Sequence, residues 1–426
     1  MTNTVSHYCV VGTYPETAKG SKFTLDDNSN PNSAHREANR IAWLSLKLIP
    51  GLGNKTIIRL VEVFGSVEKI LSAGLADLFD AGLRRDKALH ALAAKRFSRD
   101  PETEWQFLKS NNFRLISIQD DDYPSNLAEI PDPPAVLFAS GAIEPRDLVS
   151  IAVVGSRYAS PAGIIFAEKL SSDLASSGLT VVSGLALGID SAAHRGAIKA
   201  HGRTLAVLGC GLDVNYPSIN ADLRKEITGA GVLVTEFIAS TPPSAGNFPS
   251  RNRIISGLSL GVVIVEAAER SGSLITARFA LEQGREVFAV PGIAQSMRSK
   301  GAHKLIKEGA KLIESAEDVL EEIRPLVRSA HHSASTPSGE HEELSVICRH
   351  SGGSRNPVAV DQVGFQTPAG PEETALLKIL DKVPKHIDEI AQEANMPVQR
   401  VAAVLLGLEL QGLVSQLPGK YFICSL

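Results

Sequence analysis

Small, hydroxyl and cationic residues follow two of the apolar runs in the middle of the chain, and such groups bind anions. Ser156 and Arg157 come directly after IAVVG, and a helix is expected just beyond them. Backbone amides, a hydroxyl and a guanidinium can therefore converge on a phosphate there. Ser183 and Gly184 follow LTVV in the same way, and the glycine lets the backbone approach a ligand closely. Both loops are candidates for phosphate binding.

A cationic cluster marks the start of a further expected helix, in the run FPSRNR. Arg251 and Arg253 would lie in its first turn, although the helix dipole favours negative charge at that end. A bound phosphate would relieve this conflict, with Asn252 beside it, and Phe248 could stack on a nucleic-acid base. In the alternative, both arginines point away and pair with carboxylates. We favour the phosphate because two cations and an amide share one helix start.

A fourth loop of the same kind is ERSGS, which ends in Gly272 and Ser273 and leads into LITARFALEQGR. Its hydroxyls and free amides would again meet at a helix N-terminus. Four such loops at one edge of a sheet predict a groove for a polyanion, although they do not separate a nucleotide from a polynucleotide. The first loop lacks the glycine spacing GxGxxG, which disfavours a dinucleotide, and we expect no cofactor.

Candidate catalytic residues carry a weaker signal. Asp190 and His194 are one helical turn apart, so a carboxylate and an imidazole could act together as a general base. More often such a pair fixes a helix start, and we favour that interpretation, with His194 packed under the loop. Cys210 has no base near it in sequence and is expected to be a small buried residue. Asp213 and Glu236 lack partners spaced for a metal, and no two cysteines are close, so no metal site is predicted.

Alternating strands and helices must position these loops. The runs IAVVG, LTVVSG, TLAVLG, VLVTEF, GVVIVEA and EVFAVPG are short and rich in valine, and amphipathic segments separate them. Continuous apolar strands with intervening helices predict a parallel sheet covered on both faces, so the fold class is α/β with a Rossmann-like core over residues 111–324. Ligands bind such sheets at the carboxyl ends of the strands.

Four further segments flank this core. We expect a disordered tail over residues 1–35, a helical domain of the helix-hairpin-helix or SAM-like type over 36–110, a flexible linker over 325–370 and a winged helix over 371–426. The glycine turn LIPGLGNK of the helical domain either holds a phosphate or only turns the chain. The winged helix has 5 Lys and Arg against 7 Asp and Glu, a poor composition for binding a duplex.

Charge and hydropathy limit the class of protein. The whole chain carries a net charge of −4, but residues 151–310 hold 16 Lys and Arg against 12 Asp and Glu, so the basic excess lies in the core. A local excess of this kind suits a polyanionic partner. No apolar run is long enough to span a membrane, and no secretory signal opens the sequence, so we expect a cytoplasmic protein.

The loops also support a family resemblance. In this order, the runs GSR, SGLALGID, LGCGLDVNYP, FPSRNRIISGLS, SGSLITA and SKGAHKLIKEGA, with the preceding YP…DPP segment, resemble the DprA/Smf family of DNA-processing proteins over residues 36–323. The resemblance implies a non-catalytic protein that binds and protects incoming single-stranded DNA during natural transformation. It further implies that the protein loads the RecA recombinase, displaces single-strand-binding protein and forms a homodimer through its Rossmann-like core.

The motifs of that family assign roles to particular residues. The resemblance implies contacts with the DNA strand from Arg157, Phe248, Arg251 and Asn252, and backbone or hydroxyl contacts from Ser156, Ser183, Gly184, Gly272 and Ser273. Two positions depart from the family pattern, because Phe237 replaces a usual proline and His303 a frequent asparagine. Neither change removes a charge from the loops.

Two other functions stay open at this point. Rossmann-like hydrolases of nucleoside monophosphates also place a Gly-Ser/Thr loop before a helix. They would need a glutamate and arginine pair, for which Glu266 and Arg278 are the nearest candidates. The winged helix alone would suit a transcription regulator, although its acidic composition speaks against duplex binding.

Overall fold

The computed structural model divides the chain into two compact units, Met1–Gly339 and Glu340–Leu426. In the first unit it describes residues 31–82 and 87–333. In the second it describes residues 376, 379–380, 385–394, 396, 400–401, 404–405, 408, 414–417 and 421–424. Across these described ranges, no helix is long and apolar enough to cross a membrane. Most of the predicted tail and the linker from residue 334 on lie outside them.

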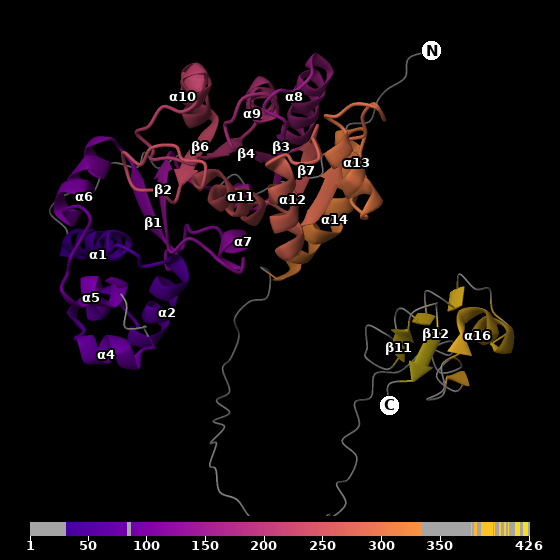
Figure 1. Cartoon of the computed structure of the whole chain (residues 1–426). Helices are drawn as coiled ribbons and strands as arrows, with labels where there is room; N and C mark the ends of the chain where they lie inside the picture. Colours follow the sequence, from indigo (N-terminus) through magenta and orange to yellow (C-terminus); the bar gives the residue numbers. More distant parts are fainter. Residues whose placement is uncertain are drawn as a thin grey trace, which may run out of the picture. The chain divides into compact units, whose positions relative to one another are not determined.

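Helices form the first part of the described chain, at one end of the central sheet (Figure 1). They are α1 (Pro31–Lys47), α2 (Asn54–Phe64), α3 (Val67–Ser72), α4 (Leu75–Asp80), α5 (Lys87–Ala93) and α6 (Pro101–Ser110). The first helix begins at Pro31, before the predicted boundary at residue 36, and proline suits a first helical turn because it has no N–H to leave unpaired. Trp43, Leu60 and the sheet residue Phe138 belong to one buried cluster, so these helices pack directly on the core.

Six parallel strands make up most of the central sheet. They are β3 (Ser150–Gly155), β4 (Thr180–Ser183), β5 (Thr204–Val207), β6 (Gly231–Thr235), β7 (Gly261–Val265) and β8 (Glu286–Ala289). Each coincides with one of the valine-rich runs, so the predicted α/β class with a parallel core is confirmed.

The complete sheet has nine strands and is mixed, in the order β1-β2-β6-β5-β4-β3-β7-β8-β9. At one edge, β1 (Arg114–Ser117) and β2 (Val136–Ser140) pair antiparallel with each other, and β2 pairs antiparallel with β6. At the other edge, the short β9 (Lys311–Leu312) continues the parallel pairing. The sequence analysis does not predict these two antiparallel strands; β2 follows the turn signal DPP.

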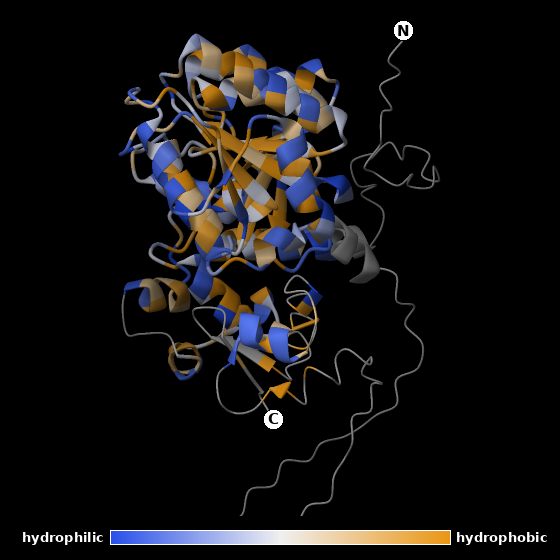
Figure 2. Cartoon of the chain, turned by 90° about the vertical axis from the view of Figure 1, so that its right-hand side faces the viewer, coloured by the Kyte–Doolittle hydropathy of each residue, from blue (hydrophilic) through white to orange (hydrophobic). Residues whose placement is uncertain are grey.

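Helices cover both faces of this sheet, and the strands between them are predominantly hydrophobic (Figure 2). One face carries α8 (Pro161–Ser176), α9 (Ile189–Lys199), α10 (Ala221–Ala230) and α14 (Ala316–Ser333), and the other carries α7 (Ser125–Ala128), α11 (Asn247–Leu258), α12 (Ser273–Glu282) and α13 (Lys300–Lys307). Residues alternate between faces along a strand. In β3, Ile151 and Val153 face α8 and α9, whereas Ala152 and Val154 face α11 and α12.

The strand order reverses at β3. From β3 the chain moves through β4, β5 and β6 in one direction, and then returns to place β7 on the other side of β3. The loops after β3 and β7 therefore leave in opposite directions, and a crevice forms between them at the carboxyl ends of the strands.

Helix α14 extends past the predicted start of the linker at residue 325. It runs to Ser333 with Pro325 inside it. Val319, Leu320 and Ile323 are buried against the sheet, so packing holds the helix up to the proline.

The C-terminal unit contains a three-stranded antiparallel sheet in the order β10-β12-β11. Its described elements are β10 (Lys385–His386), α16 (Ile387–Glu393), β11 (Val414–Leu417) and β12 (Tyr421–Cys424). Ile390, Leu405 and Phe422 are among the residues of its core. The winged helix predicted for this segment is confirmed.

Candidate nucleic-acid interface

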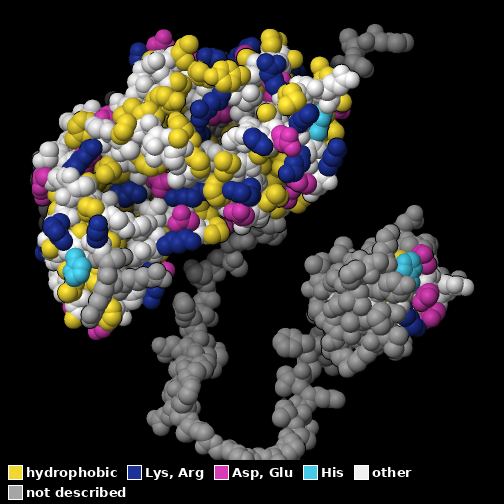
Figure 3. Space-filling model, in the orientation of Figure 1, with side chains coloured by type: hydrophobic (Ala, Val, Ile, Leu, Met, Phe, Trp, Pro, Cys, Tyr) yellow, Lys and Arg dark blue, Asp and Glu magenta, His cyan; other side chains and the backbone are white. Residues whose placement is uncertain are grey.

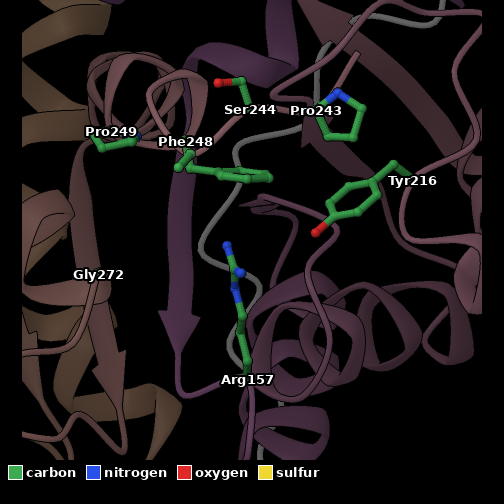
Figure 4. A pocket seen from close by; sticks show the side chains of 8 residues that line it. Arg157, Tyr216, Pro243, Ser244, Phe248, Pro249 and Gly272 are labelled. Atoms are coloured by element: carbon green, nitrogen blue, oxygen red, sulfur yellow. The ribbon is translucent and has the colours of Figure 1, made fainter.

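An open cavity of about 490 Å³ lies at the carboxyl edge of the sheet. Loops that follow β3, β5, β6 and β7, with the start of α11, form its walls. Its lining residues are Arg157, Tyr216, Pro243, Ser244, Ala245, Phe248, Pro249 and Gly272 (Figure 4). Three of the four predicted loops thus meet where sheets of this topology bind ligands.

A second cavity of about 170 Å³ adjoins the first and shares Arg157, Tyr216 and Phe248 with it. Gly184 and Arg251 also line this smaller cavity, so the loop after β4 belongs to the same site. The structure therefore brings Arg157 and Arg251 together, as a single polyanion groove requires.

A cation and two aromatic rings are stacked in the wall of the larger cavity. The guanidinium carbon of Arg157 lies 4.9 Å from the centroid of the Phe248 ring. The Tyr216 ring lies beside Phe248, with 5.8 Å between ring centroids and 37° between ring planes (Figure 4). Arg157 is exposed and, among the described residues, forms no ion pair with a carboxylate. Its charge is available to an anion, and the rings are available to a base.

Arg251 supplies a second cation, but from beneath the loop. Its side chain is buried, Nη2 donates a hydrogen bond to the carbonyl oxygen of Gly184 at 2.9 Å, and Nη1 lies 3.9 Å from Asp190 Oδ2. Burial lowers the pKa of Arg251, and the neighbouring Asp190 opposes that effect. A methyl group at Gly184 would overlap the guanidinium, so only glycine fits above it. Arg251 thus reinforces the floor of the smaller cavity rather than reaching freely into solvent.

Arg253 points away from both cavities. Its Nη2 donates to Glu236 Oε2 at 2.6 Å, and its Nε lies 3.3 Å from Asp132 Oδ2. Arg253 therefore pairs with carboxylates, as the alternative interpretation of the sequence predicted. The helix-dipole argument was wrong in its premise, since α11 begins at Asn247 and places both arginines beyond its first turn.

Asn252, Gly272 and Ser273 lie at the junction of α11 and α12. Asn252 Nδ2 donates to the carbonyl oxygen of Gly272 at 3.3 Å, and Gly272 lines the larger cavity. Ser273 is buried, and its hydroxyl lies 2.8 Å from that of Ser271. Gly272 is thus the member of this group that faces the cavity.

The two remaining predicted serines hold their loops in shape. Ser156 Oγ accepts a hydrogen bond from the amide of Tyr158 at 3.1 Å. Ser183 is fully buried and its hydroxyl donates to the carbonyl oxygen of Val153 at 2.7 Å. The Ser183 hydroxyl therefore donates its proton to a hydrogen bond between β4 and β3.

Sequence reasoning missed Tyr216 and the segment 243–245, which line the larger cavity. Tyr216 belongs to the motif LGCGLDVNYP, which supported the family resemblance, but it was not singled out as a ligand contact. An aromatic residue in a loop after a predicted strand was the available signal.

The face drawn in Figure 3 carries basic, acidic and hydrophobic side chains side by side over the first unit. Basic groups there do not form one uniform patch. The local arrangement in the cavities, rather than a uniform basic patch on this face, is therefore the feature of this view that suits an anion.

Comparisons with known proteins follow the same division of the chain. The model of the DNA recombination-mediator protein A family matches residues 114–324, and that of the DprA winged helix domain matches residues 362–420. Protein Smf of Escherichia coli is 37% identical to this chain, over 89% of the chain and 94% of its own length. The chain belongs to the DprA/Smf family.

Two further family members extend the comparison. The DNA processing protein DprA of Streptococcus pneumoniae is 42% identical over 64% of this chain and 94% of its own length. The X-ray structure of that organism's DprA superposes with a TM-score of 0.59 at 40% identity, covering 67% of this chain and 97% of the other. DprA-type DNA recombination mediation is thus the activity class of the family.

The two positions expected to depart from the family pattern lie in different kinds of element: Phe237 is in the loop after β6, and His303 is in α13. The amide of Phe237 donates to Thr235 Oγ1 at 3.2 Å. His303 Nε2 lies 3.2 Å from the amide nitrogen and 3.1 Å from the carbonyl oxygen of Gly292. Phe237 thus lies in a local hydrogen-bonded turn, whereas His303 connects α13 to the segment after β8.

The Asp190 and His194 pair does not face the DprA cavities as an acid–base couple. His194 is fully buried, with Nδ1 2.7 Å from Thr204 Oγ1, and burial lowers its pKa to about 3. Burial raises the pKa of Asp190, and Arg251 opposes this. The packing predicted for His194 is confirmed, as is the burial of Cys210.

The two residues considered for a hydrolase have different partners in this DprA family member. Glu266 accepts hydrogen bonds from the amide and the hydroxyl of Ser160, whereas Arg278 is exposed and lies 3.7 Å from Glu282. Asp213 accepts from the amide and hydroxyl of Ser240. Within the described part of the chain, no group of three acidic, His or Cys residues could hold a metal. The geometry does not support nucleotide hydrolysis.

Proposed function

We propose that this chain binds single-stranded DNA along the carboxyl edge of its sheet, protects it, and loads RecA onto it during natural transformation. The observation that carries the proposal is the exposed Arg157 stacked on Phe248 beside Tyr216, in an open cavity with Arg251 beneath it. The family supports the same role, because its members are DNA recombination mediators.

Single strands suit this cavity better than duplexes. An unpaired base exposes its π-face, which stacks on aromatic side chains whatever its identity, and the adjoining phosphate can meet a guanidinium. In a duplex the base faces are covered by neighbouring bases. We therefore expect binding that prefers single strands and depends little on sequence.

The proposed DNA interface divides into groups that touch the strand and groups that hold the loops. Arg157, Phe248 and Tyr216 would contact a base or a phosphate, and the backbones of Gly184 and Gly272 would lie close to it. The residues that shape these loops are Ser156, Ser183, Arg251, Asn252 and Ser273.

Further elements of the proposal come from the family resemblance. They are homodimer formation through the core and displacement of single-strand-binding protein. A cytoplasmic location and the absence of a cofactor are also part of the proposal, and these two expectations come from the sequence itself. Two such grooves in a dimer would align a strand for the recombinase.

The test compares Arg157→Ala with wild type on a labelled oligonucleotide, by fluorescence anisotropy over a range of salt. The variant should bind single strands more weakly by about 1–3 kcal/mol, because a charged hydrogen bond to phosphate is lost. Its salt slope should fall by about 0.7 for each phosphate contact removed. Arg278→Ala is the control, since that exposed arginine lies on α12 outside the cavity lining. Equal affinity of the Arg157 variant and wild type, or a preference for duplex, would refute the proposal.

A further inference from the structure

A polar cluster joins the N-terminal helices to the core at the side of α11 that faces away from the cavities. Asn54, the first residue of α2, donates from Nδ2 to Glu236 Oε2 at 3.1 Å. Its Oδ1 accepts from the amide of Ala135 at 3.3 Å and from Lys47 Nζ at 3.4 Å. One amide side chain therefore connects α1, α2, the segment before β2 and the loop after β6.

Glu236 carries this connection to α11. The same Oε2 atom that accepts from Asn54 also accepts from Arg253 Nη2 at 2.6 Å. Glu236 and Arg253 are both buried, and Asp132 lies 3.3 Å from Arg253 Nε. Lys47 and Arg253 balance Glu236 and Asp132 in charge, so the cluster keeps Arg253 paired away from water.

Helix α11 is held from two sides. Residues two apart on a helix point in nearly opposite directions, so Arg251 and Arg253 leave α11 on different sides. Arg251 is bonded beneath Gly184 at the cavity, and Arg253 is bonded to Glu236 at the N-terminal helices. Phe248 lies on the same helix, and its place against Arg157 depends on how α11 is rotated.

We propose that Asn54 and Glu236 are positioning residues for DNA binding, which fix the rotation of α11 through Arg253 and so place Phe248 and Arg251 at the groove. The proposal rests on the function proposed above. It assigns the glycine turn LIPGLGNK and the helix after it a role in affinity that needs no phosphate at the turn itself.

The decisive variant is Asn54→Asp, which keeps the acceptor for Ala135 and Lys47 but sets a carboxylate against Glu236. The repulsion should shift Glu236 and Arg253 and weaken single-strand binding about tenfold, the effect of about 1.4 kcal/mol. Adding Glu236→Gln should restore affinity to within about twofold of wild type, because the glutamine amide can donate to the new carboxylate and accept from Arg253. Such a rescue requires the direct contact, and general destabilisation would not produce it.

The control is Arg40→Gln, which removes an ion pair between α1 and Asp120 and so loosens the same helices from the core at a different point. It should leave DNA affinity unchanged. Melting temperatures are measured for every variant, and Asn54→Ala, with an expected loss of about threefold, replaces Asn54→Asp if that variant does not fold.

The outcomes separate the two proposals. If wild type binds no single-stranded DNA, the proposed function fails. If wild type binds and Asn54→Asp binds equally well, the positioning role alone fails. It also fails if Glu236→Gln gives no rescue, or if Arg40→Gln weakens binding as much as Asn54→Asp does.

Discussion

His194 is a neutral imidazole enclosed by the core. It lies on α9, is fully buried, and contacts the hydroxyl of Thr204 on β5 at 2.7 Å. Burial lowers its pKa from 6.5 to about 3. The unfolded chain therefore takes up a proton on this residue at a pH at which the folded chain does not.

This shift predicts a loss of stability in acid. Because the folded pKa is depressed, the contribution of His194 is fully present above about pH 6.5 and is lost as the pH falls toward 3. Between pH 7 and pH 5 the free energy of unfolding should fall by about 2 kcal/mol from this residue alone. Urea denaturation of wild type and His194→Gln at both pH values measures it.

The His194 variant should lose that pH-dependent part, whatever its stability at pH 7. His90→Gln is the matched control, because His90 is exposed and its substitution should leave the pH dependence of wild type intact. An equal loss in the His194 variant and wild type would assign the effect to another group.

The residue types in the sequence predicted well which side chains gather at the groove. They predicted less well which contacts each side chain makes there. Arg157 and Arg251 were expected in one groove and line one cavity. The sequence could not show that Arg253 pairs with Glu236 or that the Ser183 hydroxyl is bonded to Val153, because those partners come from other elements. Such pairings depend on the register of packed elements, which residue spacing does not encode.

At the level of elements, the N-terminus of α8 holds an internal anion. Ser160 caps the helix by accepting from the amide of Gly163, and the Glu266 carboxylate accepts from the amide and hydroxyl of Ser160. In dinucleotide-binding folds, the helix after the first strand holds a pyrophosphate at this position. Here a side chain from the end of β7 occupies it, which disfavours a free nucleotide at α8.

Removing that carboxylate should weaken the helix start. Glu266→Ala should lower the free energy of unfolding by about 1–2 kcal/mol, since the acceptor for the Ser160 amide and hydroxyl and a favourable charge at the helix N-terminus are lost together. Chemical denaturation at neutral pH provides the measurement. Glu269→Ala, at an exposed position in the following loop, should change stability far less. A Glu266 variant as stable as wild type would show that the contact contributes nothing.

The strands of the core were the most predictable elements. Their valine-rich runs end in glycine, serine or acidic residues, and β3 to β8 follow them closely. The pair β1 and β2 was not predicted, because antiparallel pairing at a sheet edge depends on contacts with β6 and on the helices beside it. The start of α11 at Asn247 lies one residue before the run FPSRNR, where this helix was expected to begin, but it places both arginines beyond the first turn.

At the scale of the whole molecule, the C-terminal segment differs from the proposed DNA groove in its net charge. Residues 371–426 contain 5 Lys and Arg and 7 Asp and Glu, and α16 begins with Asp388 and Glu389. Net negative charge repels phosphates. Deleting residues 371–426 should therefore change single-strand affinity by less than about threefold at physiological salt, by the same measure used for Arg157→Ala. A larger loss would place DNA contacts in the winged helix.

The reversal of strand order at β3 determines when the cavity is completed during synthesis of the chain. Arg157 follows β3 and Gly272 follows β7, and these neighbouring strands are joined by way of the far side of the sheet. During translation the first wall of the cavity leaves the ribosome well before the last. The cavity is thus complete only after β7 has been inserted into the sheet, and a protease cut between β6 and β7 would divide its lining residues between two fragments.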